Sequence, residues 1–175
     1  NDNLEEEIEQ TFNLHKATGR AITFKTPPAQ KYPGNGGNFG MVNGVISDNG
    51  LQSAEWFGWE GGDMEAVIDL GSQTEISSVK VAVFESKGSW IYRPSSFMVY
   101  VSDNNQDYTE AGSGKPGEMQ AVDLPRMLQC EFNTRNAKPK ARYLKIVLKN
   151  YGIIPSGLPG AGHKAWLFAD EIEIN

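Results

Sequence analysis

The strongest constraint on what this chain can fold into is an alternation of apolar and polar residues with a period of two. Apolar residues take every second position in six short segments, at residues 64–70, 79–83, 97–101, 128–132, 144–148 and 172–174. These segments are rich in β-branched residues and are bounded by Gly, Asn, Asp, Ser or Pro, which is typical of half-buried strands separated by turns. From residue 13 onward no segment has the 3.6-residue period of an amphipathic helix. The pattern therefore predicts an all-β fold, a sandwich or a barrel, in which loops at one end carry the function.

The 175 residues are enough for one domain with a buried core. The first twelve residues differ from the rest, because glutamates crowd around Leu4, Ile8 and Phe12. We interpret residues 1–12 as a linker or the end of a preceding domain, and residues 13–175 as a single domain. Gly- and Pro-rich sequence at residues 26–44 predicts a long ordered loop, and the glycines within residues 112–117 predict a flexible turn.

The charge pattern argues against a nucleic-acid partner. The formal net charge is -6, and Lys and Arg are scattered rather than gathered into the basic stripe that a phosphate backbone needs. No apolar run approaches the roughly 20 residues that span a bilayer. The single cysteine, Cys130, alternates with Leu128 and Phe132, which predicts a buried strand thiol and leaves no partner for an internal disulfide.

The sequence also lacks a catalytic motif. Two histidines, His15 and His163, and one cysteine are too few for a zinc site of the His and Cys type. An SxxK match at Ser77–Lys80 falls in a predicted strand rather than at the start of a helix. No pair of carboxylates stands out in a loop polar enough to separate two pKa values. We therefore expect that the domain itself is not an enzyme and has no catalytic residues.

Five segments, in this order along the chain, resemble the discoidin-like domain, also called the coagulation factor 5/8 type C domain. They are Asn13–Phe24 (NLHKATGRAITF), Met41–Val45 (MVNGV), Ala66–Gly71 (AVIDLG), Arg93–Ser102 (RPSSFMVYVS) and Ala169–Ile174 (ADEIEI). Four others are similar to the C-terminal module of bacterial chitobiases, which are β-N-acetylhexosaminidases of glycoside hydrolase family 20. They are Lys25–Pro28, Tyr32–Gly34, Trp56–Asp63 and Gly88–Tyr92. The resemblance implies a β-sandwich or jelly roll of the galactose-binding-domain-like type over residues 13–175.

The same resemblance implies a function. It points to a non-catalytic carbohydrate-binding module of a secreted or periplasmic bacterial glycoside hydrolase, binding galactose- or N-acetylglucosamine-type glycans through end loops. Its partners would be a glycan and the attached catalytic domain, and the module would be a monomer. The alternative is a structural spacer or protein-interaction domain with no glycan ligand. A third class, membrane binding through residues 90–92, is disfavoured by the net charge.

A saccharide needs an aromatic ring for its apolar face and several polar groups for its hydroxyls. The candidates in the predicted loops are Trp59, Glu60, Trp90, Tyr92, Arg93 and His163. Each has a structural alternative: Trp59 could pack internally, and Arg93 could pair with a carboxylate. Trp56 and Trp166 are expected in the core. If the assignment holds, Trp90→Ala or Arg93→Ala abolishes binding without unfolding the domain.

The resemblance also implies a structural calcium ion, which needs six to eight oxygen ligands. The implied ligands are Gly40, Asn43, Val45, Asp48, Asp170 and Glu171. In this set Glu171 provides a carboxylate, Asp170, Gly40 and Val45 provide carbonyls, and Asp48 restores a charge. Asn43 stands where the family usually has Asp, which keeps an oxygen but removes a charge. The alternative is a hydrogen-bonded loop without metal.

Overall fold

The structure is a computed structural model that describes residues 10–47, 50–116, 124–134 and 138–175. Residues 1–9 of the expected linker at residues 1–12, and the expected ligand Asp48, lie outside these ranges. Nine strands are present in the described part, and the helices there are three short 3₁₀ turns. The strands are β1 (Ala21–Phe24), β2 (Phe57–Glu60), β3 (Met64–Glu75), β4 (Ser78–Glu85), β5 (Ser96–Ser102), β6 (Thr109–Pro116), β7 (Arg126–Asn133), β8 (Lys140–Lys149) and β9 (Trp166–Ile174). The 3₁₀ turns are η1 (Gly37–Val42), η2 (Gly50–Gln52) and η3 (Lys87–Ser89).

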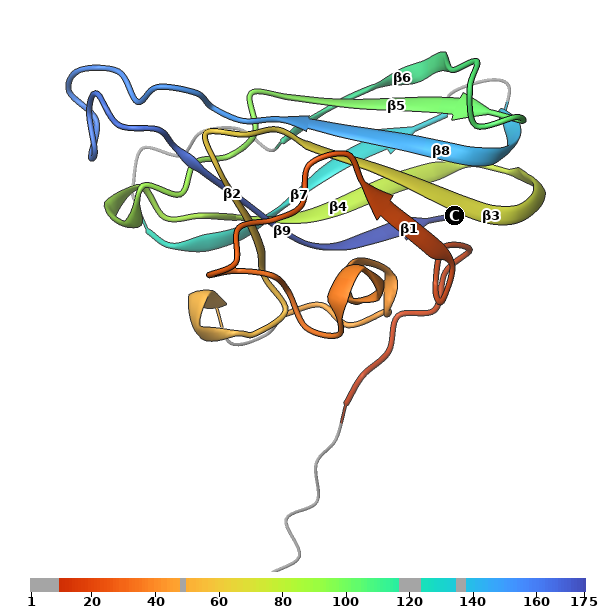
Figure 1. The fold of residues 1–175 in the computed structure, drawn as a ribbon, viewed down its shortest axis with the longest axis horizontal. Coiled ribbons are helices and arrows are strands. Elements are labelled where there is room, and N and C mark those ends of the chain that lie inside the picture. The colour runs from red at the N-terminus through yellow and green to blue at the C-terminus, as the bar shows by residue number, and fades with distance from the viewer. Residues whose placement is uncertain (1–9, 48–49, 117–123, 135–137) are drawn as a thin grey trace, which may run out of the picture.

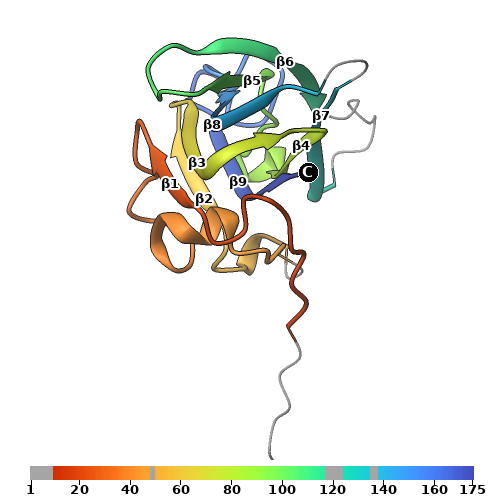
Figure 2. The ribbon, with the colours of Figure 1, turned by 90° about the vertical axis from the view of Figure 1, so that its right-hand side faces the viewer.

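The strands form two antiparallel layers, which confirms the predicted β-sandwich (Figures 1 and 2). Hydrogen-bonded neighbours follow the order β1-β3-β8-β5-β6-β7-β4-β9-β2. The layer β1-β3-β8-β5-β6 continues into the layer β7-β4-β9-β2 only through β6 and β7. Those two strands pair at Lys115↔Glu131 and Pro116↔Cys130.

The core lies between the layers and is made by the alternating residues. Met64, Ala66, Ile68 and Leu70 of β3 are all buried, and the inward-facing residues of β4, β5, β8 and β9 pack against them. Burying each such side chain contributes about 1.5–3 kcal/mol, which offsets the entropy of ordering the strands. Cys130 is fully buried in β7, as expected, and burial raises the pKa of its thiol to about 12, so the thiol is unreactive.

The glycine-rich stretch before residue 117 is a strand, not the flexible turn that its composition suggested. Residues 109–116 form β6, which pairs with β5. The glycines are needed for close packing, because a Cβ at Gly112 would come 2.4 Å from the Phe132 ring and one at Gly114 would come 2.1 Å from the Glu131 carbonyl oxygen. Trp59 also lies in a strand, β2, rather than in a loop.

The long loop predicted at residues 26–44 contains η1 but no strand. Three connections gather at one end of the sandwich, on the left in Figure 1: the β2–β3 turn, the β4–β5 connection with η3, and the β8–β9 connection. Within the described ranges no helix has the length and apolar character needed to cross a membrane.

Candidate functional site

The β4–β5 connection holds Trp90 at the tip of a tight loop. Ser86 and Ile91 pair through two backbone hydrogen bonds at the base of this loop, of 2.9 and 3.0 Å. Between them η3 turns the chain, and the Trp90 N–H donates to the Lys87 carbonyl oxygen at 2.9 Å. Trp90 takes a left-handed backbone conformation, with φ 61°, which residues other than glycine rarely adopt. It nevertheless leaves 37% of its surface exposed.

The Trp90 ring is held in place by the β8–β9 connection. The His163 ring stacks on it with 4.5 Å between ring centroids and 18° between ring planes. Gly160 packs so closely that a Cβ there would come 2.6 Å from the indole. The Trp166 N–H also donates to the Trp90 carbonyl oxygen at 2.8 Å. Trp90 and His163 therefore form a preorganised aromatic platform at the end of the sandwich.

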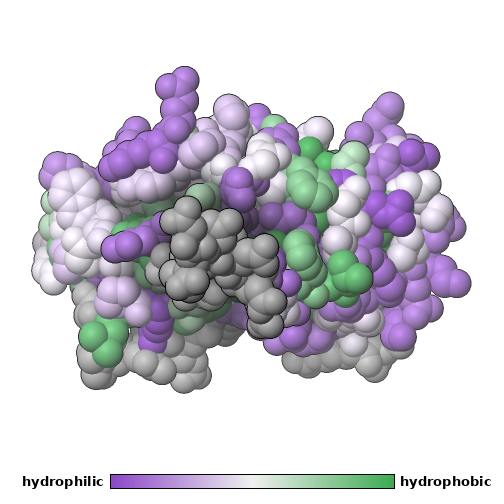
Figure 3. Space-filling model, turned by 90° about the horizontal axis from the view of Figure 1, so that it is seen from below, coloured by the Kyte–Doolittle hydropathy of each residue, from purple (hydrophilic) through white to green (hydrophobic). Residues whose placement is uncertain are grey.

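An open groove of about 610 Å³ begins one residue away from this platform. Its lining residues are Gly50, Leu51, Gln52, Phe84, Ser86, Ser89, Pro125, Arg126 and Met127. The groove combines an apolar floor with hydroxyl, amide and guanidinium groups, and the two serine hydroxyls lie 3.3 Å apart. All three residues of η2 line the groove, and the face of the molecule seen from below in Figure 3 carries apolar residues scattered among hydrophilic ones.

Two of the expected ring platforms are buried instead. Trp59 is 2% exposed, packs beside Phe24 and Phe57, and donates its Nε1–H to the Thr26 carbonyl oxygen at 3.0 Å. Tyr92 is 1% exposed, and its hydroxyl donates to the Pro159 carbonyl oxygen at 2.8 Å. Neither ring has a face open to a ligand, because Trp59 points into the core from β2 and Tyr92 packs with Tyr151 and Ile154 of the β8–β9 connection. Tyr92 instead anchors the connection that carries His163.

Arg93 is also buried, and its alternative role as the partner of a carboxylate is the one observed. Its Nε and Nη2 donate to the two carboxylate oxygens of Glu85 at 2.8 and 2.7 Å. Arg126, in the groove lining, donates to Glu85 Oε2 at 2.8 Å from the other side. Burial raises the pKa of Glu85, but the hydrogen bonds from the two arginines outweigh it, and the net shift of the pKa is downward. Arg93 thus supports the groove from within.

The remaining candidates are Glu60, which was expected to contact the ligand, and Trp56 and Trp166, which were expected in the core. Glu60 is exposed at the end of β2 and lies opposite Trp166 in the sheet. Trp166 is half-buried and packs edge-on against Tyr32, and Trp56 is buried against Phe84, so both fill the interior as expected. The structure thus brings together Trp90 and His163 from the predicted set.

Several groove residues carried no sequence signal. Arg126 and Met127 begin β7, and Gln52 belongs to η2, so they meet only after folding. Gly160 stood within a Gly- and Pro-rich loop, but nothing in the sequence linked it to Trp90. Only the folding of the whole domain brings these distant positions together.

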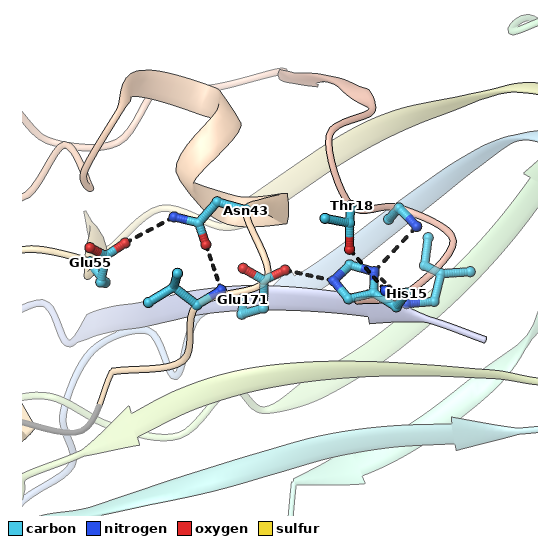
Figure 4. A network of polar contacts seen from close by, with 8 residues as sticks. His15, Thr18, Asn43, Glu55 and Glu171 are labelled. Carbon is cyan, nitrogen blue, oxygen red and sulfur yellow. Dashed lines mark hydrogen bonds and ion pairs between the residues drawn. The ribbon is translucent and has the colours of Figure 1, made fainter. Parts of the chain in front are cut away.

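The expected metal region centres on two adjacent buried carboxylates of β9, Asp170 and Glu171. The β4–β9 register shifts beside them. Asp170 Oδ2 accepts from the Ser47 N–H at 2.6 Å, and Glu171 Oε1 lies 2.8 Å from His15 Nε2 (Figure 4). Asp170 Oδ1 and Glu171 Oε2 are buried and have no hydrogen-bond partner among the described residues. Burial, the largest cause, raises the pKa of Asp170 to about 7 and also raises that of Glu171.

The other expected ligands in the described residues, Gly40, Asn43 and Val45, lie in η1 and in the loop that follows it. The Asn43 amide oxygen accepts a hydrogen bond from the Val45 N–H at 2.7 Å, and its Nδ2 donates to Glu55 Oε2 at 3.2 Å (Figure 4). The amide therefore forms hydrogen bonds within its own loop and to Glu55. Gly40 is buried in η1, where a Cβ would meet the Asn35 carbonyl oxygen. Asp170 was expected to offer its carbonyl, but its side chain contacts the loop at Ser47. The described residues include no cluster of three or more His, Cys, Asp and Glu side chains suited to a metal.

The two orphaned oxygens nevertheless fit a hard cation. Buried ionised carboxylates are costly unless they are paired or bound to a metal. Calcium takes carboxylate and backbone carbonyl oxygens together, so two carboxylates and the carbonyls of a tight loop are a suitable donor set. Asp170 and Glu171 would hold the ion, which would supply charge neutralisation and no reaction chemistry.

Comparison with known proteins identifies the family. The sequence model of the F5/8 type C domain matches residues 28–158. None of the curated proteins compared with the chain is similar to it. The chain belongs to the F5/8 type C domain family, as the resemblance of its segments suggested.

Solved structures of similar fold include a fucose-binding module of Streptococcus pneumoniae, 18% identical with a TM-score of 0.55 over 93% of this chain and 94% of that chain. Another is chitosan-binding module 1 from a chitosanase/glucanase of Paenibacillus sp. IK-5, 14% identical with a TM-score of 0.54 over 91% and 96%. A third is CBM32-1 from a family 31 glycoside hydrolase of Clostridium perfringens, 15% identical with a TM-score of 0.50 over 90% and 94%. At these identities the likeness establishes the fold.

Proposed function

We propose that this domain is a non-catalytic carbohydrate-binding module that binds glycan at the Trp90–His163 platform and the adjoining groove. The observation that carries the proposal is the partly exposed Trp90 ring, which stacks on His163 and belongs to a residue with a positive φ. Strained backbone positions persist where the surrounding structure holds them, and they cluster at ligand sites. The modules of similar fold named above bind fucose or chitosan, which supports the same class of ligand here.

The chemistry of the site suits a neutral sugar. The apolar C–H face of a pyranose packs on an indole ring, while its hydroxyls exchange hydrogen bonds with side chains such as Ser86, Ser89 and Arg126. Each exchange replaces a bond to water, so the net gain per hydrogen bond is only about 0.5–1.5 kcal/mol. An open groove therefore binds one sugar weakly, and the module works by raising the effective glycan concentration near an attached domain.

We infer that the attached domain is a glycoside hydrolase, a β-N-acetylhexosaminidase of the chitobiase type, in a bacterial periplasm or outside the cell. The four segments similar to chitobiase modules support this parent, and galactose- or N-acetylglucosamine-type glycans are the corresponding ligands. The fold neighbour from a family 31 glycoside hydrolase supports the general setting.

A glycan array with wild-type and Trp90→Ala domains tests the binding proposal. We expect the wild type to bind a subset of galactose- or N-acetylglucosamine-containing glycans, and Trp90→Ala to lose at least tenfold in affinity with an unchanged melting temperature. Phe39→Ala, which removes another exposed ring that does not line the groove, is the matched control and should bind normally. A wild type that binds no glycan would favour the spacer, and equal binding by Trp90→Ala would refute the assignment of the site.

We also propose that Asp170 and Glu171 hold a structural calcium ion. Their orphaned, buried oxygens and the raised pKa of Asp170 support a missing positive charge at this point. A ligand that binds only the folded state stabilises it by mass action. The alternative is a loop closed by hydrogen bonds alone.

Thermal unfolding at pH 7.5 with calcium or with a chelator tests the metal. At a calcium concentration about 100 times the Kd, we expect a stabilisation of about 2.7 kcal/mol, seen as a rise in Tm of several degrees. Glu171→Gln should abolish the calcium response, whereas Glu65→Gln, on β3, should keep it. A wild-type Tm that does not respond to calcium or chelator would contradict the proposal.

A further inference from the structure

The two layers separate where β6 and β7 should continue to pair, and this opens a hollow between the two strands. The two strands pair only at Lys115 and Pro116 of β6, and residues 109–114 of β6 have no pairing partner in β7. Between them lies an open groove of about 830 Å³, within the range of ligand sites. Its lining residues are Val101, Thr109, Glu110, Ala111, Gly112, Ser113, Glu131, Phe132, Asn133, Thr134 and Pro139. Because β6 begins and β7 ends here, the groove lies at the opposite end of these strands from the Trp90 platform.

The groove is built into the sheet rather than left by poor packing. Gly112 allows the Phe132 ring to lie against the backbone of β6, since a Cβ there would come 2.4 Å from the ring. The β5–β6 register also shifts at this point, between Val99 and Tyr100, which leaves Ala111 as an extra residue of β6, and a bulge of this kind bends the strand that carries it. Phe132, itself buried, thus forms an apolar floor together with Val101 and Ala111.

The walls of the groove carry polar groups that are available to a ligand. The side chains of Thr109, Glu110, Ser113 and Asn133 are exposed and form no hydrogen bond with any other described residue. Glu131 is partly engaged, with Lys80 Nζ 3.5 Å away. Among the described residues that line the groove there is no lysine or arginine. Its chemistry is therefore hydroxyl, amide and carboxylate over an apolar floor.

That chemistry selects among ligands. The charged groups among the described lining residues are the carboxylates of Glu110 and Glu131, and Lys80 offsets part of the Glu131 charge. The negative charge that remains disfavours anionic sugars and phosphates. Hydroxyl and amide groups beside an apolar floor suit the alternating polar edge and apolar face of a neutral sugar chain. A peptide added as a strand would need a regular edge, but the bulge in β6 and the end of β7 at Asn133 leave few backbone groups in register.

We propose that this β6–β7 groove is a second glycan site, which takes a neutral, extended oligosaccharide. The inference rests on the proposed function, because it extends sugar binding to a second place on the same domain. Two weak sites on one rigid body bind a polysaccharide with higher avidity than either site alone. The module would then bind one glycan chain through two sites, one at each end of the sandwich.

Residue-resolved amide NMR of the 175-residue chain separates the two sites. The probes are lacto-N-tetraose and tetra-N-acetylchitotetraose, with tetragalacturonate as the acidic control. In a Trp90→Ala background we expect a neutral probe to shift amides of residues 109–113 and 131–134, with tetragalacturonate at least tenfold weaker. Thr109→Ala combined with Asn133→Ala, which removes no hydrogen bond within the described structure, should weaken those shifts at least fivefold.

The outcomes distinguish this inference from the proposed function. Shifts confined to residues 86–91 of the wild type would overturn the second site and leave the first in place. Groove shifts without any response at residues 86–91 would overturn the Trp90 site and keep the second. A response of the groove to a Lys-Val hexapeptide but to neither neutral glycan would overturn the sugar assignment, as would the absence of any shift in residues 109–113 and 131–134.

Discussion

Trp90 and Arg93 lie three positions apart in the sequence but have different roles, one at the surface and one in the interior. Trp90 turns outward at a left-handed position and keeps its ring exposed, whereas Arg93 enters the interior and pairs with Glu85. The Glu85 carboxylate also accepts from Arg126, so one buried anion fixes two guanidinium groups. Charged hydrogen bonds of this kind are stronger than neutral ones and position their groups sharply. In the proposed site the ligand contact belongs to Trp90, and Arg93 is a positioning residue.

Arg93→Ala should therefore act on stability before it acts on binding. Removing one partner of a buried ion pair leaves a carboxylate that Arg126 only partly compensates, and we expect a loss of about 3 kcal/mol in the free energy of unfolding. Urea denaturation measures this loss. At a temperature where the variant is folded, its glycan affinity should stay within about threefold of the wild type. A variant of normal stability that does not bind would show instead that Arg93 contacts the ligand.

At the scale of elements, the β8–β9 connection is the support of the site. Ile154 and His163 pair across it, with the Ile154 N–H donating to the His163 carbonyl oxygen at 2.9 Å. The Tyr92 hydroxyl fixes its far side at Pro159. The connection thereby presents His163 and Gly160 to the Trp90 ring as one preformed surface, which lowers the entropy that binding must offset.

Gly160→Ala tests this support. Its Cβ would come 2.6 Å from the indole, so the ring must move. Gly157→Ala in the same connection is the matched control, because both glycines have positive φ, 81° and 88°, but a Cβ at Gly157 meets nothing within 4 Å. Both variants should lose about 1 kcal/mol of stability from backbone strain. Isothermal titration calorimetry should show weaker glycan binding for Gly160→Ala alone, and equal affinities would contradict the platform.

The strands could be predicted from the sequence because their alternation is a local property. The six alternating segments all lie within strands, and Cys130 is buried as expected. β6 was missed because its glycines look like a turn, and only the packing of Phe132 against Gly112 explains them. Trp59 was expected at the surface because its Gly-rich neighbours look like a loop, and Tyr92 because its burial depends on the β8–β9 connection, about 60 residues further along the chain. The contact of Trp90 with His163 joins residues 73 positions apart, a separation that no local pattern encodes.

For the whole molecule, the sandwich acts as a rigid frame with different chemistry at its two ends. The interlocked core holds the layers together, so the loops need not fold on binding. One end carries the platform and its groove, and the other end of β6 and β7 carries the second groove. The buried carboxylates of β9 lie under the loop that follows η1, where a cation would tie that loop to the frame.

The most direct measurement is a glycan titration followed through the indole N–H signals of the four tryptophans in an NMR spectrum. Trp59 is buried and donates its indole N–H to the carbonyl oxygen of Thr26, which does not line the groove, so it serves as the internal reference. With the glycan that binds best on the array, we predict a saturable shift of the Trp90 signal while the Trp59 signal does not move. A Trp90 signal that does not move while the glycan binds elsewhere, or no binding by any glycan, would contradict the account.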